Sequence, residues 1–113
     1  MEKINAAAQQ LRTAHGARVS TLELDTSSLS SVRGAATKFR AMLDSGEVDS
    51  FQVLLCNAGG YFRGPLSYSK DGYETTFATN CLGHFLLIEL LTERMGDNVR
   101  DQLPWTLGNV QGN

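Results

Sequence analysis

The sequence has little cysteine and no cluster of positive charge. Its two cysteines, Cys56 and Cys81, are too few and too far apart for a disulfide framework or a metal site. We therefore expect no bound metal, and we interpret the cysteines as buried thiols in a reducing compartment. Lysine and arginine are scattered along the chain and the formal net charge is −2. This distribution argues against a nucleic-acid partner.

The sequence also lacks a long apolar run. The longest one, residues 82–91, is far short of the ~20 residues that a membrane-spanning helix needs, and it contains His84 and Glu89. The first residues are polar and rich in alanine, without the apolar core of a secretory signal. We therefore expect a cytoplasmic protein with no membrane span.

What the sequence does contain is an alternation of helical and strand-like segments. Residues 2–15 are good helix formers followed by a glycine, and apolar residues recur every three or four positions over 29–44. Both stretches predict helices. Residues 18–24 carry β-branched side chains and residues 51–56 form a short apolar run, so both predict strands. A longer helix is predicted over 71–95.

The order strand, helix, strand favours an α/β fold. Two parallel strands of one sheet need a crossover connection, which the helix over 29–44 would supply. At 113 residues the chain forms one domain at most. A loop over 57–70 follows the carboxyl end of the second predicted strand, where open α/β sheets bind ligands.

Four polar or small residues stand where chemistry is expected, and each has a plainer interpretation. Asn80 lies on an otherwise apolar helix face, so its amide must be hydrogen-bonded, either to a strand backbone or in a catalytic site. Gly59 either makes a turn or lets a ligand approach the backbone. Asp25 is typical of a helix cap. We interpret His84 as a satisfied core residue and not as a catalytic base.

Two of these stretches together resemble the short-chain dehydrogenase/reductase family. Residues 54–60 read LLCNAGG and residues 77–87 read FATNCLGHFLL; the family has an Asn-Ala-Gly strand end followed by a helix that carries the Asn of an Asn-Ser-Tyr-Lys catalytic set. The resemblance implies an NAD(P) cofactor and a Rossmann-like, doubly wound parallel sheet. By the same resemblance Asn80 is the catalytic Asn, Asn57, Ala58 and Gly59 lie beside the adenosine ribose, and Asp25 binds the adenine amino group.

Other parts of the family pattern are absent from this sequence. It has no glycine-rich phosphate turn and no Tyr-x-x-x-Lys. The resemblance therefore covers an internal slice of the fold, which lacks the first strands and the C-terminal half. We expect residues 1–96 to form a partial NAD(P)-binding Rossmann-like domain, and 97–113 to be a divergent tail in a loop or disordered.

The function implied is that of a truncated short-chain dehydrogenase/reductase. The family oxidises alcohols or reduces carbonyl compounds with NAD(P), but we expect this chain by itself to be inactive. An alternative is an interaction or regulatory fragment that forms a homo- or hetero-oligomer through the helix over 73–95. The sequence decides neither the substrate nor NAD against NADP, because the residues that select them are absent.

The resemblance also raises a question about the sheet. In the doubly wound strand order 3-2-1-4-5-6, two strands separate the positions matched by residues 18–24 and 51–56. These segments must either leave a gap or move together to the strand spacing of about 4.8 Å. We expect contact.

Overall fold

The computed structural model describes residues 2–96, and every statement about the structure refers to these residues. The tail predicted over 97–113 lies outside them. The described part contains two long helices and a third, irregular one. In chain order the elements are α1 Glu2–His15, α2 Leu29–Ser45, α3 Thr75–Phe77, the π-helical turn η1 Ala78–Leu82, α4 Gly83–Leu91 and the 3₁₀ turn η2 Thr92–Arg94.

The first two predicted helices are confirmed, and local chemistry explains their limits. The side chain of Ser28 accepts a hydrogen bond from the Ser31 amide at the start of α2, which satisfies one of the free N–H groups of the first turn. At the other end Gly46 has φ 80°, a left-handed conformation that glycine adopts without steric cost because it has no Cβ. The N–H of Gly46 donates a hydrogen bond to the carbonyl oxygen of Leu43.

The third helix begins later than predicted and contains a π turn. Glu74 caps it, because its carboxylate accepts hydrogen bonds from the amides of Thr76 and Phe77. These bonds lower the pKa of Glu74, since they favour the ionised form. The turn Ala78–Leu82 then follows the i→i+5 pattern, which holds more residues per turn than an α-helix and shifts the faces on either side of it.

This shift changes which residues are buried. Ala78, His84, Leu87 and Leu91 face the core, whereas Asn80 is exposed. The expectation that Asn80 lies on an otherwise apolar, packed face is therefore wrong, because its side chain is exposed. Both cysteines are also exposed, so the prediction that Cys56 and Cys81 are buried thiols is wrong.

The predicted strands do not form a sheet among the described residues. Residues 18–24 and 51–56 are extended, but no ladder joins them, and the β-bridge that the structure does contain pairs Tyr68 with Glu74. The expectation that the two segments come into contact as neighbouring strands is wrong. A parallel strand finds its hydrogen-bond partners in adjacent strands, and the neighbours required by the doubly wound order are not in this sequence.

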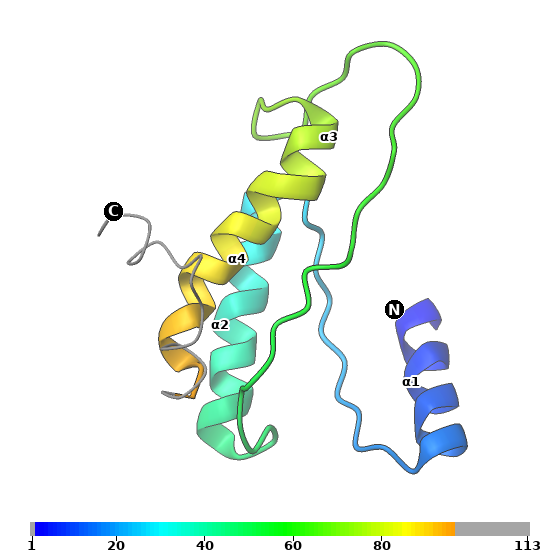
Figure 1. Ribbon diagram of the computed structural model, residues 1–113, viewed down its shortest axis with the longest axis vertical. Coiled ribbons are helices and arrows are strands. Elements are labelled where there is room, and N and C mark those ends of the chain that lie inside the picture. Colours follow the sequence, from blue (N-terminus) through cyan, green and yellow to red (C-terminus); the bar gives the residue numbers. More distant parts are fainter. Residues whose placement is uncertain (1, 97–113) are drawn as a thin grey trace.

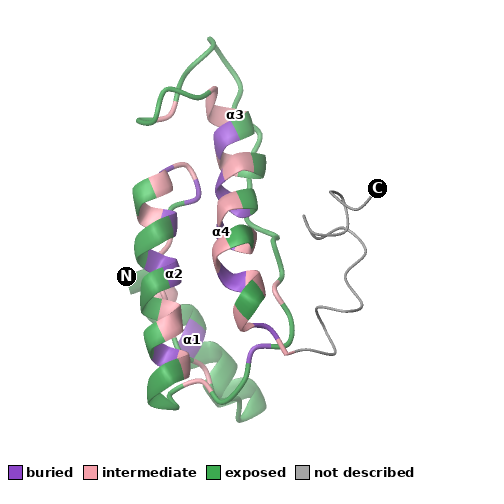
Figure 2. Cartoon of the chain, turned by 90° about the vertical axis from the view of Figure 1, so that its left-hand side faces the viewer, coloured by how far each residue is buried: buried purple, intermediate pink, exposed green. Residues whose placement is uncertain are grey.

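The segments nevertheless lie in layers like those of an α/β protein. Helix α1 lies on one side, the extended segments run through the middle, and α2 packs against α4 on the other side (Figure 1). Figure 2 shows buried residues concentrated where α2 and α4 face each other. The core consists of Val32, Ala36, Phe51, Leu87, Leu91 and Met95. None of the helices in the described part is long and apolar enough to cross a bilayer.

Candidate functional site

Asn80 holds the end of the second extended segment through both atoms of its amide. Its Oδ1 accepts a hydrogen bond from the Gly60 amide at 2.9 Å, and its Nδ2 donates to the Gly60 carbonyl at 2.8 Å. A Cβ at Gly59 would lie 2.8 Å from the same Oδ1, closer than van der Waals contact permits. A side chain at position 59 would therefore push the Asn80 amide away from Gly60, and glycine permits this close approach.

His84 attaches the same segment at a second point. Its Nε2 lies 2.6 Å from the Ala58 carbonyl oxygen, which can only accept, so Nε2 carries the proton. The ring is buried, and its Nδ1 has no partner among the described residues. The sequence interpretation treated His84 as a core residue and missed this role. The signal that could have shown it is the i, i+4 spacing of Asn80 and His84.

The π turn accounts for the position of Asn80. It spans Ala78–Leu82 and so includes Asn80, while His84 lies in the first turn of the α-helix that follows. Turns of this kind are rare and occur frequently at functional sites. Here the extra residue lets Asn80 reach Gly60 while His84, one turn on, reaches Ala58.

Asp25 ends the first extended segment in an Asx turn. Its Oδ1 accepts hydrogen bonds from the backbone amide of Ser27 at 2.9 Å and from the Ser27 hydroxyl at 2.6 Å. These two bonds, with a smaller contribution from the charge of Lys70, hold the pKa of Asp25 below its ordinary value. The N-cap of α2 is Ser28, so the interpretation of Asp25 as a helix cap is wrong; its side chain instead closes a local turn with Ser27.

The third helix contacts both the turn after Asp25 and the end of the second extended segment. A Cβ at Gly83 would lie 2.0 Å from the Thr26 carbonyl oxygen, so the turn after Asp25 packs directly on the third helix. The same helix holds Ala58 and Gly60 through side chains one and three residues away from Gly83. The structure thus gathers the ends of both extended segments at the beginning of one helix.

The remaining chemistry of this region is limited. Among the described residues no group of three or more His, Cys, Asp or Glu side chains could hold a metal ion. Partial desolvation raises the pKa of the Cys56 thiol, which keeps it protonated and unreactive at neutral pH. Asn57, Ala58 and Gly59 are exposed, so their backbone is open to a ligand.

Sequence comparisons relate the chain to known proteins. No protein-family model matches the chain. The chain is 41% identical over 85 residues to the chloroplastic short-chain dehydrogenase TIC 32 A of Brassica napus, over 75% of this chain and 25% of that protein. It is 43% identical over 79 residues to the human WW domain-containing oxidoreductase, and the match covers 70% of this chain and 18% of that protein. It is 37% identical over 97 residues to mouse retinol dehydrogenase 12, and the match covers 85% of this chain and 29% of that protein.

All three of these relatives carry the names of dehydrogenases or oxidoreductases. The chain belongs, over the matched stretch, to the short-chain dehydrogenase/reductase family. It spans about a quarter of the length of the curated relatives it matches.

Proposed function

We propose that this chain carries the adenosine-facing part of a cytoplasmic NAD(P)-dependent alcohol or carbonyl oxidoreductase, and that it transfers no hydride by itself. The observation that supports this most is the two-point attachment of Ala58 and Gly60 by His84 and Asn80. It holds an exposed backbone of small residues in a fixed conformation at the end of an extended segment. A ribose can approach such a backbone closely.

The residues present fit the adenosine half of a dinucleotide. Asp25 uses Oδ1 for both of its bonds to Ser27. Its Oδ2 accepts no hydrogen bond from another described residue, so it remains an acceptor for the amino group of adenine. When bound, NAD(P) would supply the hydride chemistry, and Asp25 and Asn57 to Gly59 would hold its adenosine end.

The residues present do not fit the reacting end. Proton transfer in this family needs a tyrosine with a lysine four residues later, because the lysine lowers the pKa of the tyrosine. In this sequence Tyr61, Tyr68 and Tyr73 are followed at that spacing by Pro65, Gly72 and Phe77. We assign Asn80 the place of the catalytic Asn, but both ends of its amide are bonded to Gly60. In this chain it is a positioning residue.

Cofactor titration of the isotope-labelled 113-residue chain tests the proposal. With NADH or NADPH we expect amide shifts in the NMR spectrum confined to Asp25 and 57–60. We expect no loss of reduced-nicotinamide absorbance when an aldehyde or ketone is added. Asp25→Ala should abolish the shifts, whereas Asp49→Ala, a matched exposed carboxylate in the Arg18–Asp49 ion pair, should keep them. Turnover would overturn the proposal. So would a dispersed spectrum in which neither NADH nor NADPH shifts any amide peak.

A second candidate function is pairing with another subunit through the third helix. Tyr73, Phe77, Cys81 and Phe85 follow one another at every fourth position, and all four are exposed. Phe77 and Phe85 are 54% and 51% exposed, which is unusual for a row of large apolar side chains. This row would pack against an equivalent helix of a second copy or of a full-length relative.

Sedimentation of the chain with and without a purified full-length relative tests this candidate. We expect a complex that the double variant Phe77→Ser/Phe85→Ser abolishes and that Leu11→Ser, at an exposed position of α1, leaves intact. A monomer in both mixtures would refute the pairing.

A further inference from the structure

The loop that follows Gly60 projects from the molecule and is held at both ends. We use the name apical loop for residues 61–66. Asn80 holds Gly60 at its start, and at its end the Ser67 carbonyl accepts a hydrogen bond from the Thr75 amide at 2.9 Å. Between these points the loop makes no backbone hydrogen bond to another described residue. Figure 1 shows it arching beyond α3, far from the end of α2.

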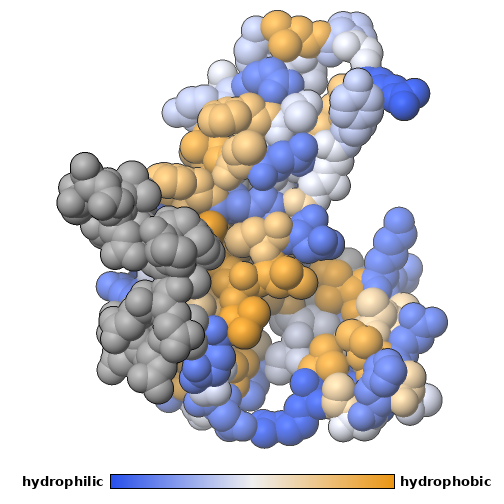
Figure 3. Space-filling model, in the orientation of Figure 1, coloured by the Kyte–Doolittle hydropathy of each residue, from blue (hydrophilic) through white to orange (hydrophobic). Residues whose placement is uncertain are grey.

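The apical loop exposes large side chains with apolar bodies. Tyr61 is 81% exposed and Leu66 is 71% exposed. The ring of Phe62 folds back toward the base of the loop, since a Cβ at Gly60 would lie 3.2 Å from it. Large apolar side chains exposed together in one short loop are a feature of interaction sites. This surface is separate from the hydrophobic area that Figure 3 shows in the middle of the molecule, between the helix pair and α1.

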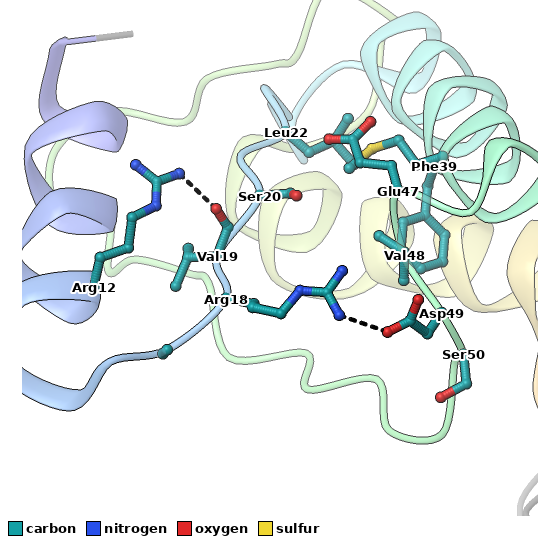
Figure 4. Close-up of a pocket in the computed structure, with 12 residues that line it drawn as sticks. Arg12, Arg18, Val19, Ser20, Leu22, Phe39, Glu47, Val48, Asp49 and Ser50 are labelled. Atoms are coloured by element: carbon teal, nitrogen blue, oxygen red, sulfur yellow. Dashed lines mark hydrogen bonds and ion pairs between the residues drawn. The ribbon is translucent and has the colours of Figure 1, made fainter.

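Arg63 adds a positive charge to the same loop. Its guanidinium carbon lies 5.4 Å from the centre of the Tyr61 ring, and its side chain makes no hydrogen bond or ion pair with another described residue. Arginines elsewhere are engaged within the molecule: Arg12 donates to a backbone carbonyl, and Arg18 pairs with Asp49 (Figure 4). The Arg63 charge is therefore available to an anionic group outside the chain.

The sequence around the loop has no compensating negative charge. Residues 57–70 include Arg63 and Lys70 and no acidic residue, although the formal net charge of the chain is −2. The next acidic residues along the chain are Asp71 and Glu74. Both carboxylates accept hydrogen bonds from backbone amides at the starts of helices, where negative charge is stabilised. The apical loop thus combines exposed apolar groups with a net positive charge.

This combination fits the boundary between the headgroups and the acyl chains of an anionic membrane. Aromatic side chains with a polar end lie at that level of a bilayer, and basic residues are attracted to anionic lipids. We propose that the apical loop docks this chain on the surface of anionic lipid bilayers, with Tyr61 and Leu66 inserted among the headgroups and Arg63 beside an anionic headgroup. Docking of this kind needs no membrane-spanning helix and does not depend on the proposed adenosine site.

Co-sedimentation of the 113-residue chain with lipid vesicles tests the docking. The probes are vesicles of phosphatidylcholine alone and of phosphatidylcholine with about one third phosphatidylserine. We expect roughly tenfold stronger binding to the anionic vesicles, and a preference that weakens as salt is added. No binding to the anionic vesicles would overturn the proposal and leave a protein as the partner of this surface. Equal binding to both kinds of vesicle would also overturn it.

Two double variants separate the loop from general stickiness. Tyr61→Ser/Leu66→Ser removes the inserting side chains and should weaken binding to anionic vesicles roughly tenfold. Val53→Ser/Leu55→Ser is the matched control, because these apolar side chains are 79% and 82% exposed in the second extended segment. It should bind as the unaltered chain does, with the helical circular dichroism of both variants unchanged. Unweakened binding of the loop variant, or an equal loss in the control, would overturn the proposal.

A pair of single variants tests the charge. Arg63→Gln should weaken binding to the anionic vesicles about fivefold and leave any binding to neutral vesicles unchanged. Arg33→Gln, at an exposed position of α2, should have no effect. Bicelles that contain a spin-labelled lipid then locate the contact, because the amide NMR peaks of 61–66 should broaden while those of α1 should not. Equal effects of the two arginine variants, or broadening that spares the loop, would overturn the proposal.

Discussion

The α2–α4 pair and the two extended segments come from sequence of similar apolar content, but only the helices satisfy their own backbone. Each turn of a helix bonds to the next, and α2 and α4 pack together around Val32, Leu87 and Leu91, with Phe51 of the second extended segment completing the core. Residues 52–57 of that segment make no backbone hydrogen bond to another described residue. Stability should therefore be concentrated in the helix pair, and substitutions in the two regions should differ sharply.

The largest difference is expected for truncation of a core leucine. Leu91 is 3% exposed in the α2–α4 core, so Leu91→Ala should lower the free energy of unfolding by about 3 kcal/mol through lost transfer energy and a cavity. Val53→Ala, in the extended segment, should change it by less than about 0.5 kcal/mol. Urea unfolding followed by helical circular dichroism measures both. Similar losses at the two positions would mean that the segments share the core's stability.

The next largest effect is expected at the contact between the third helix and the first segment. Gly83→Ala places a methyl group 2.0 Å from the Thr26 carbonyl oxygen, and the backbone must move at a cost of about 2 kcal/mol. Gly34→Ala in α2 meets nothing within 4 Å and should stabilise the chain by about 1 kcal/mol. Opposite signs in the same urea experiment confirm the contact, and two stabilising results would contradict it.

Loss of the helix cap should have a smaller effect. Ser28→Ala removes the acceptor of the Ser31 amide and should cost about 1 kcal/mol, whereas Ser28→Asp keeps an acceptor and should cost little. The thermal midpoint of the helical signal reports both. An equal drop in the two variants would place the role of Ser28 in packing and not in capping.

The turn at Asp25 should respond to pH in one direction. Bonds from Ser27 lower the folded pKa of this carboxyl, so its contribution to stability is present above the unfolded pKa of about 3.9 and is lost as pH falls through the folded value. The Ser27 amide shift should therefore titrate with a midpoint below about 3.9, and Asp25→Asn should remove the step. A midpoint at or above that value would rule out the turn.

The smallest effect belongs to the ion pair between Arg18 and Asp49. Arg18 and Asp49 lie 2.7 Å apart, but both side chains are largely exposed. Water and salt screen such a pair, so Arg18→Gln should change the free energy of unfolding by less than about 0.5 kcal/mol. Asp49→Asn is the matched variant. A loss above 1 kcal/mol in either, measured by urea unfolding, would show that the segments are tied together more firmly than their missing ladder indicates.

The sequence predicted what depends on near neighbours in the chain. Helices α1 and α2 follow from periodicity and capping residues such as Ser28 and Gly46. The π turn at Ala78–Leu82 escaped prediction, because the extra residue is invisible to a regular 3.6-residue period. The prediction of a sheet failed for a different reason, because parallel strands pair with segments that are distant in the sequence.

The candidate site shows the same division. The residues at the strand end and Asn80 were predicted from their motifs, and the structure joins them through the amide of Asn80. The role of His84 was not predicted, because its partner is a backbone carbonyl that carries no sequence signal. The exposure of Cys56 and Cys81 was missed because burial depends on tertiary packing, which the apolar character of a local stretch does not determine.

The exposure of Val53 and Leu55 also has a consequence for the life of the molecule in a cell. Extended apolar segments with free backbone edges are what chaperones and proteases recognise, and they promote aggregation. The exposure of these two side chains should therefore shorten the time that the chain survives as described here.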